Sequence, residues 1–229
     1  MTARFLKAAA VHALTASGIV CALLALFASL DRQFEIAFLW LGLAFLIDGI
    51  DGTFARLYDV KKNTPHVSGE TLDLCVDYVT YVFIPVVMLR LAGFLPGWFG
   101  IVLAAAILMS SLYHFSDLGS KSDDNCFVGF PAIWNIFAFY VFAFAMPVWL
   151  VAVLVLTFAV LTFVRIKFVH PMRVTDLRVP TFVATGAWSA AAFHVAWQGF
   201  PGSLVANTVL ALVALYGAFL SIRFGMDGR

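Results

Sequence analysis

Eight long apolar segments follow one another along this chain, and each is about as long as one membrane-spanning helix. They cover residues 9–30, 35–57, 72–91, 97–116, 128–146, 148–168, 180–198 and 203–223. A helix needs about 20 apolar residues to cross the hydrocarbon core of a bilayer. With 63% hydrophobic and only 12% charged residues among 229, the chain has more apolar surface than a soluble fold of this size can bury. The pattern predicts an all-α, polytopic integral membrane protein with eight transmembrane helices.

The basic residues predict the orientation of these helices. If the N-terminus lies in the cytoplasm, twelve of the 14 Lys and Arg residues fall in cytoplasmic segments, and only Arg32 and Arg90 fall outside. Cytoplasmic loops of membrane proteins carry this excess of Lys and Arg. We therefore expect both termini in the cytoplasm. The first segment is long for the apolar part of a signal peptide, so we expect it to be retained as a helix.

The chain is expected to form one domain, residues 1–229, because no internal repeat or low-complexity linker divides it. The net charge is only +1, which indicates no nucleic-acid partner. Three scattered cysteines, Cys21, Cys75 and Cys126, have neither the number nor the spacing of a disulfide framework or a metal site.

Four aspartates interrupt the second and third apolar segments close to the loop that joins them. A carboxylate at the centre of a membrane helix costs roughly 2.5–3.5 kcal/mol, so its presence indicates a function. Asp48 and Asp51 share one helical face, and Asp73 and Asp77 share another. Because the loop is short, the two helices should pack as an antiparallel pair and the acidic faces can meet.

Carboxylates crowded in this way repel one another unless cations neutralise them. A site made of oxygen ligands suits Mg²⁺ or Mn²⁺, and two such ions commonly assist displacement at phosphorus. The sequence thus predicts a site for divalent metal ions, formed by Asp48, Asp51, Asp73 and Asp77.

The two acidic faces belong to a longer pattern that resembles the signature of the CDP-alcohol phosphotransferases. All eight signature positions are present: Asp48, Asp51, Gly52, Ala55, Arg56, Gly69, Asp73 and Asp77. The resemblance covers about 30 residues on two predicted membrane helices. It implies transfer of a phosphorus-containing group from a CDP-activated donor to an alcohol, with Asp77 as the general base.

Further features resemble one branch of this family, the bacterial phosphatidylcholine synthases. They are the twelve residues between Arg56 and Gly69, a longer gap than is usual in the family, the eight spans, and the segment Lys167 to Val174. The resemblance implies CDP-diacylglycerol and choline as substrates, CMP as a product, and Mn²⁺ as the cofactor. It also implies a homodimer in the bacterial inner membrane with the active site facing the cytoplasm.

The remaining signature residues and two further arginines are candidates for binding the CDP group and phosphate, and each also has a purely structural explanation. The small residues Gly52, Ala55 and Gly69 leave room for a bulky ligand beside the metal site, and the resemblance implies that they bind the CDP group together with Arg56. Arg56 can equally be a charged anchor at the membrane surface. The same holds for Arg173 and Arg178, the candidate phosphate-binding residues.

Choline carries a quaternary ammonium group, which aromatic faces attract. The candidates near cytoplasmic helix ends are Tyr81, Tyr78, Tyr113 and Trp134, each of which could instead be a packing residue. Among them Tyr81 continues the helical stripe of Asp73 and Asp77.

Two other functions remain open at this point. The first is the same reaction with another alcohol: serine, inositol or glycerol phosphate. The second is a divalent-cation transporter that uses the intramembrane carboxylates. Transporters often contain two related halves, but the acidic motif has no counterpart in the second half of this chain.

Overall fold

The computed structural model describes residues 3–117, 119, 127–168 and 177–226, and it consists almost entirely of helices. In chain order the elements are α1 (Ala3–Leu30), α2 (Phe34–Leu57), α3 (Val60–Asn63), α4 (Gly69–Asp77), the π-helix η1 (Tyr78–Phe83), α5 (Ile84–Leu91), α6 (Gly97–Ser116), β1 (Phe127–Val128), α7 (Trp134–Ala143), α8 (Val148–Leu161), β2 (Lys167–Phe168), α9 (Arg178–Gln198) and α10 (Leu204–Met226). The strands β1 and β2 pair antiparallel over two residues each.

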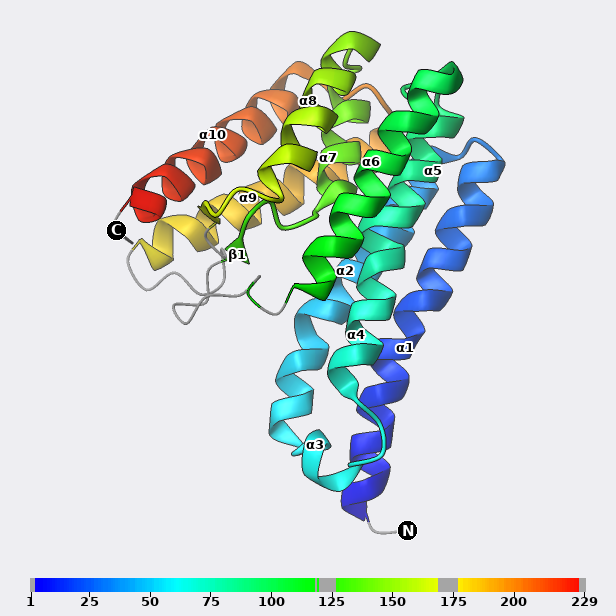
Figure 1. Ribbon diagram of the computed structural model, residues 1–229, viewed down its shortest axis with the longest axis vertical. Helices are drawn as coiled ribbons and strands as arrows, with labels where there is room; N and C mark the ends of the chain where they lie inside the picture. The colour runs from blue at the N-terminus through cyan, green and yellow to red at the C-terminus, as the bar shows by residue number, and fades with distance from the viewer. Residues whose placement is uncertain (1–2, 118, 120–126, 169–176, 227–229) are drawn as a thin grey trace.

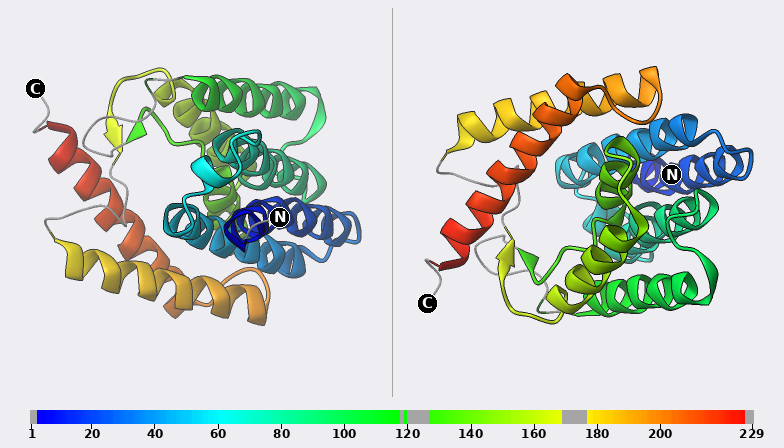
Figure 2. Two further views of the ribbon diagram at one scale, coloured as in Figure 1. Left: turned by 90° about the horizontal axis from the view of Figure 1, so that it is seen from below. Right: turned by 90° about the horizontal axis from the view of Figure 1, so that it is seen from above.

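Helices α1 to α8 form a bundle, and the last two helices, α9 and α10, lie obliquely against it (Figure 1). Helix α1 packs along α2 and also contacts α4 and α5, which continue one another through η1. Helices α9 and α10 form a hairpin that contacts the bundle through α9 and α2 (Figure 2). Small side chains such as Ala22, Ala25 and Ala37 are almost fully buried, which allows close packing between apolar helices.

The predicted all-α fold is confirmed, since each of the eight apolar segments contains a helix. Among the described residues, four helices are long and apolar enough to cross a membrane: Ala3–Leu30, Gly69–Leu91, Gly97–Ser116 and Leu204–Arg223. Large apolar side chains also point outward, including Trp98, which is 83% exposed, and Leu204, which is 84% exposed. A surface of this kind fits a lipid environment. Eight spans and cytoplasmic termini remain predictions.

The fifth and sixth apolar segments contain shorter helices than predicted. Helix α7 has 10 residues and α8 has 14, whereas about 20 are needed for one span. The backbone before α7 is not helical: Gly129 has a φ of +83°, and its lack of a side chain lets the chain pass close to Thr162, whose carbonyl oxygen would lie 2.4 Å from a side chain there. Pro131 follows, and proline disfavours a helical conformation in the residue before it.

Local sequence sets the start and the shape of the helix that carries Asp73 and Asp77. The Ser68 hydroxyl accepts a hydrogen bond from the backbone N–H of Thr71, which caps the start of α4. Pro85 cannot donate to the carbonyl four residues earlier, at Tyr81. The wider turn of η1 lies just before it, where the N–H of Ile84 donates to the carbonyl of Val79. A π-helical turn of this kind is frequent at functional sites.

The loop between α2 and α4 is held against the first helix. His12 Nε2 lies 2.9 Å from the hydroxyl oxygen of Thr64, and Val60 of α3 packs against Ala8 and Val11. The Lys7 ammonium lies 5.5 Å from the centre of the Tyr58 ring. The extra residues of this loop therefore form an ordered contact with α1.

Candidate active site

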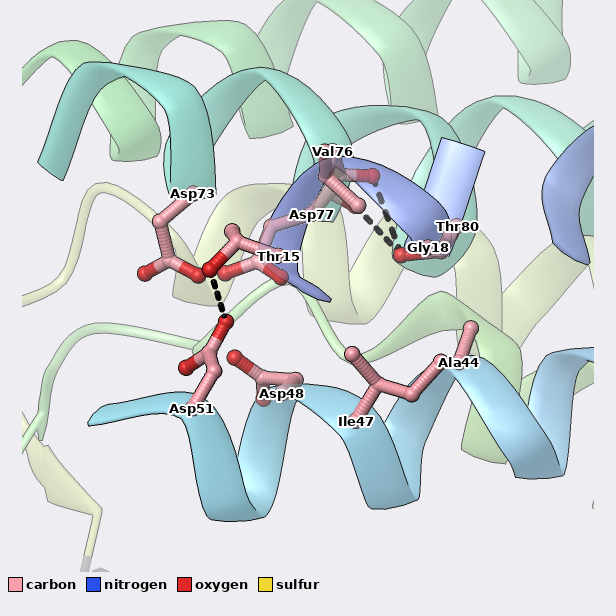
Figure 3. Close-up of a pocket in the computed structure, with 10 residues that line it drawn as sticks. All are labelled: Thr15, Gly18, Ala44, Ile47, Asp48, Asp51, Asp73, Val76, Asp77 and Thr80. Carbon is pink, nitrogen blue, oxygen red and sulfur yellow. Dashed lines mark hydrogen bonds between the residues drawn. The ribbon is translucent and has the colours of Figure 1, made fainter. Parts of the chain in front are cut away.

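Helices α2 and α4 bring the predicted aspartates together, as Figure 3 shows. Carboxylate oxygens of Asp48, Asp73 and Asp77 lie within 4.8 Å of one another, and all three residues are partly buried. The expectation that the two acidic faces meet is thus confirmed. Asp51 is more deeply buried, at 6% exposure, and its Oδ2 accepts a 2.6 Å hydrogen bond from the hydroxyl of Thr15 on α1.

The three grouped carboxylates fit a divalent cation. In an octahedral site with metal–oxygen distances near 2.1 Å, opposite ligand oxygens are about 4.2 Å apart, so oxygens within 4.8 Å need only a small contraction. The four aspartates line a small cavity that also includes Thr15 and Gly18 of α1. A cation in this cavity would stabilise charges that otherwise repel one another.

The hydroxyl of Tyr81 is part of the acidic site. It donates a 2.7 Å hydrogen bond to Oδ2 of Asp48. The Tyr81 ring is only 8% exposed and meets the ring of Phe45 edge-on. The structure thus gives this residue a contact with a candidate metal ligand, and its predicted contact with choline stays a prediction.

The other three aromatic candidates differ in their surroundings. The Tyr78 hydroxyl donates to the carbonyl of Leu108 on α6, while Tyr113 is 54% exposed. Trp134 is fully buried and donates to the hydroxyl of Ser111. These contacts give Tyr78 and Trp134 packing roles between helices, and a choline contact by any of the three remains a prediction.

The candidate CDP-binding residues lie near the acidic group on both helices. Arg56 is exposed, and its guanidinium donates to the hydroxyl of Thr53. Two of the small residues lie against α1: Ala55 packs on the Ala8, Val11 and Val60 cluster, and a side chain at Gly69 would lie 3.2 Å from the ring of His12. Gly52 has open space around it, with the Arg56 guanidinium 3.6 Å from a side chain built there.

Of the two candidate phosphate-binding residues, only Arg178 lies among the described residues. Arg178 is exposed at the first position of α9, with its guanidinium 5.5 Å from the centre of the Phe182 ring. Arg173 lies outside the described residues. A phosphate contact by either arginine stays a prediction.

Sequence reasoning missed the part that α1 plays in the site. Thr15 reaches Asp51 on α2, and Gly18 lets α1 lie close to α4, because a side chain there would lie 2.7 Å from Cγ1 of Val76 on α4. Thr15 and Gly18 are three residues apart and so share a helical face. That spacing was available in the sequence, but no sequence signal shows which helix the face packs against.

Comparison with known proteins gives consistent results. Residues 10–156 match the family model of CDP-alcohol phosphatidyltransferases, a range that includes all four aspartates. A protein of Pseudomonas aeruginosa is 47% identical over 182 residues, which is 80% of this chain and 76% of that protein. A protein of Bradyrhizobium diazoefficiens is 42% identical over 93% of this chain and 81% of its own length, and one of Rhizobium meliloti is 38% identical over 92% and 88%. All three relatives are named phosphatidylcholine synthase.

Proposed function

Because the chain belongs to the CDP-alcohol phosphatidyltransferase family, we propose that it condenses CDP-diacylglycerol with choline to give phosphatidylcholine and CMP. The observation that carries the proposal is the convergence of Asp48, Asp73 and Asp77 within 4.8 Å at the positions of the family signature. The names of the three relatives support choline as the acceptor.

The proposed reaction is a single displacement at phosphorus. The Asp77 carboxylate accepts the proton of the choline hydroxyl, and the alcohol oxygen attacks the phosphorus that carries the diacylglycerol. The bond from that phosphorus to the bridging diphosphate oxygen breaks, and CMP leaves with the electron pair. Asp77 is suited to this role because it belongs to the acidic group and is partly buried, and a positioned base contributes roughly 10²–10⁴-fold to such a step.

We propose that Asp48, Asp51, Asp73 and Asp77 hold two divalent ions, with Mn²⁺ preferred over Mg²⁺. When bound, such ions would neutralise the charge on the diphosphate of the donor. The four carboxylates would hold these ions beside Asp77, where the ions could bind the diphosphate of the donor. Gly52, Ala55, Gly69 and Arg56 are the proposed contacts of the CDP group, and Arg56 has the exposed guanidinium that such a contact needs.

Choline recognition is proposed to use aromatic faces, with Tyr81 as the first candidate because its hydroxyl contacts Asp48. Tyr78, Tyr113 and Trp134 are the further candidates, and Arg173 or Arg178 the proposed phosphate contacts.

We also propose eight membrane spans, with both termini and the active site on the cytoplasmic side of the bacterial inner membrane, and a homodimer. The distribution of basic residues supports this orientation.

An acceptor panel tests the proposed function. The purified full chain in lipid is given Mn²⁺ and CDP-diacylglycerol with choline, serine, inositol or glycerol 3-phosphate, and lipid products and CMP are measured. We expect phosphatidylcholine and CMP in equal amounts from choline alone, formed about 10²–10⁴-fold more slowly by Asp77→Asn. A lipid formed from another alcohol instead of choline would overturn the choline proposal, and CMP release without any lipid product would contradict the reaction itself.

A further inference from the structure

The hydroxyl of Thr15 differs from several other hydroxyls in these helices because its shortest contact is with a carboxylate on a neighbouring helix. Ser29, Thr157 and Thr162 each donate to the carbonyl four residues earlier in their own helix, as Ser and Thr usually do in helices. Thr15 lies 3.3 Å from the equivalent carbonyl, at Val11, but only 2.6 Å from Oδ2 of Asp51 on the neighbouring helix. A hydroxyl has one hydrogen to donate. A charged carboxylate is a stronger acceptor than a backbone carbonyl, so the hydrogen of Thr15 is directed to Asp51.

Both partners of this contact are buried. Thr15 is 8% exposed and Asp51 is 6% exposed. A buried carboxylate without a donor is costly, and a hydroxyl that binds one oxygen fixes the orientation of the other. Outer hydroxyls and amides act in this way on many metal-binding carboxylates, and their loss typically weakens metal binding by about 10–100-fold.

The packing of α1 is suited to this contact. At Gly18, one turn beyond Thr15, a side chain would lie 2.7 Å from Val76 of α4, so the absence of a side chain lets α1 approach the acidic helix pair. Thr15 and Gly18 line the same cavity as the four aspartates (Figure 3). Neither residue belongs to the signature on α2 and α4.

We propose that Thr15 is a positioning residue for the metal site: its hydroxyl holds one oxygen of Asp51 and so directs the other toward a bound divalent ion. This inference rests on the metal role of Asp51 in the proposed function and extends it to α1. Thr15 touches neither substrate nor reacting atoms in this role.

The test compares Mn²⁺ binding to the purified full-length wild-type protein and four variants, measured from the electron paramagnetic resonance signal of free Mn²⁺. Thr15→Val removes the hydroxyl at nearly constant volume, and Thr15→Ser keeps it. Ser17→Ala is the matched control, because Ser17 lies on the same helix and donates to the carbonyl of Leu14. Thr15→Ala is measured in parallel, so that the result does not depend on one substitution folding well.

We expect the valine and alanine variants to bind Mn²⁺ about 10–100-fold more weakly than wild type, and the serine and Ser17→Ala variants to bind it like wild type. Turnover of Thr15→Val should recover as Mn²⁺ is raised, with an unchanged Michaelis constant for choline. Wild-type affinity in both hydroxyl-free variants, or equal weakening by serine and valine, would overturn the proposal. So would a wild-type protein that binds no Mn²⁺. Failure of the acceptor panel with normal Mn²⁺ binding would remove the choline proposal and leave the role of Thr15 standing.

Discussion

The hydroxyl of Tyr81 donates a 2.7 Å hydrogen bond to Oδ2 of Asp48, across the interface between η1 and α2. Two hydroxyls from different segments therefore bind the two aspartates of α2, since Thr15 binds Asp51 in the same way. The candidate metal site thus depends on side chains beyond the four carboxylates.

Tyr81→Phe should reduce turnover about 10-fold or more, because a hydrogen bond to a charged group contributes roughly 1.5–3 kcal/mol. Tyr81→Ala should be at least as harmful, since it also leaves a cavity. Steady-state kinetics on both variants check this. A raised Michaelis constant for choline in the alanine variant alone would support the proposed cation–π contact of the ring, and a mild effect of phenylalanine on turnover would contradict a role for the hydroxyl in the metal site.

Asp48→Asn and Asp73→Asn should each abolish measurable turnover, because each removes one negative charge from the group that would hold the cation. A chelator should abolish the activity of the wild-type enzyme, and added Mn²⁺ should restore that activity. Formation of labelled lipid is the readout. Glu70→Gln on the exposed side of α4 is the matched control and should keep wild-type activity. Substantial activity in the presence of chelator would contradict a metal-dependent reaction.

Asp77→Asn should lower turnover by about 10²–10⁴-fold, since asparagine keeps an oxygen ligand but cannot accept the choline proton. Binding of the CDP-activated donor should change less than turnover does. Single-turnover measurements separate the two quantities. Near-normal turnover in this variant would assign the base to another residue.

Gly18→Ala should destabilise the protein and weaken Mn²⁺ binding, because the added side-chain carbon would lie 2.7 Å from Val76 and force α1 away from α4. Gly42→Ala on α2 is the control, since nothing lies within 4 Å of a side chain there. The control substitution should be neutral or slightly stabilising, as alanine favours a helix over glycine. Thermal unfolding in detergent compares the two variants, and equal midpoints would contradict the packing argument.

Reporter fusions test the topology. A reporter after Arg229 should be cytoplasmic, and a reporter inserted between Gly93 and Gly97 should lie on the opposite side, because the basic residues are distributed in that way. Location of both reporters on one side would rule out the eight-span arrangement.

Helical periodicity predicted the acidic site well because it depends on local geometry. The spacing of Asp73 and Asp77 places them on one face of any α-helix, and a short loop brings α2 and α4 together. The contact between Thr15 and Asp51 depends instead on which helix packs beside this pair. That choice follows from the fit of whole surfaces, including Gly18 against Val76, and it leaves no periodic signal in the sequence.

The lengths of the helices were also only partly predictable from the sequence. Hydropathy predicted a helix through residues 128–146, but the backbone before Trp134 follows another path because Gly129 lies against Thr162. Apolar composition reports that a segment is removed from water, and it does not report the conformation that the segment adopts there.

The contact between His12 and Thr64 makes the amino-terminal part of α1 and the loop before α4 one mechanical unit. A change in the angle between α2 and α4 would have to carry the first helix with it. The helix that supplies Thr15 to the acidic site therefore also holds the loop before α4, so α1 connects this loop with the carboxylate that Thr15 binds.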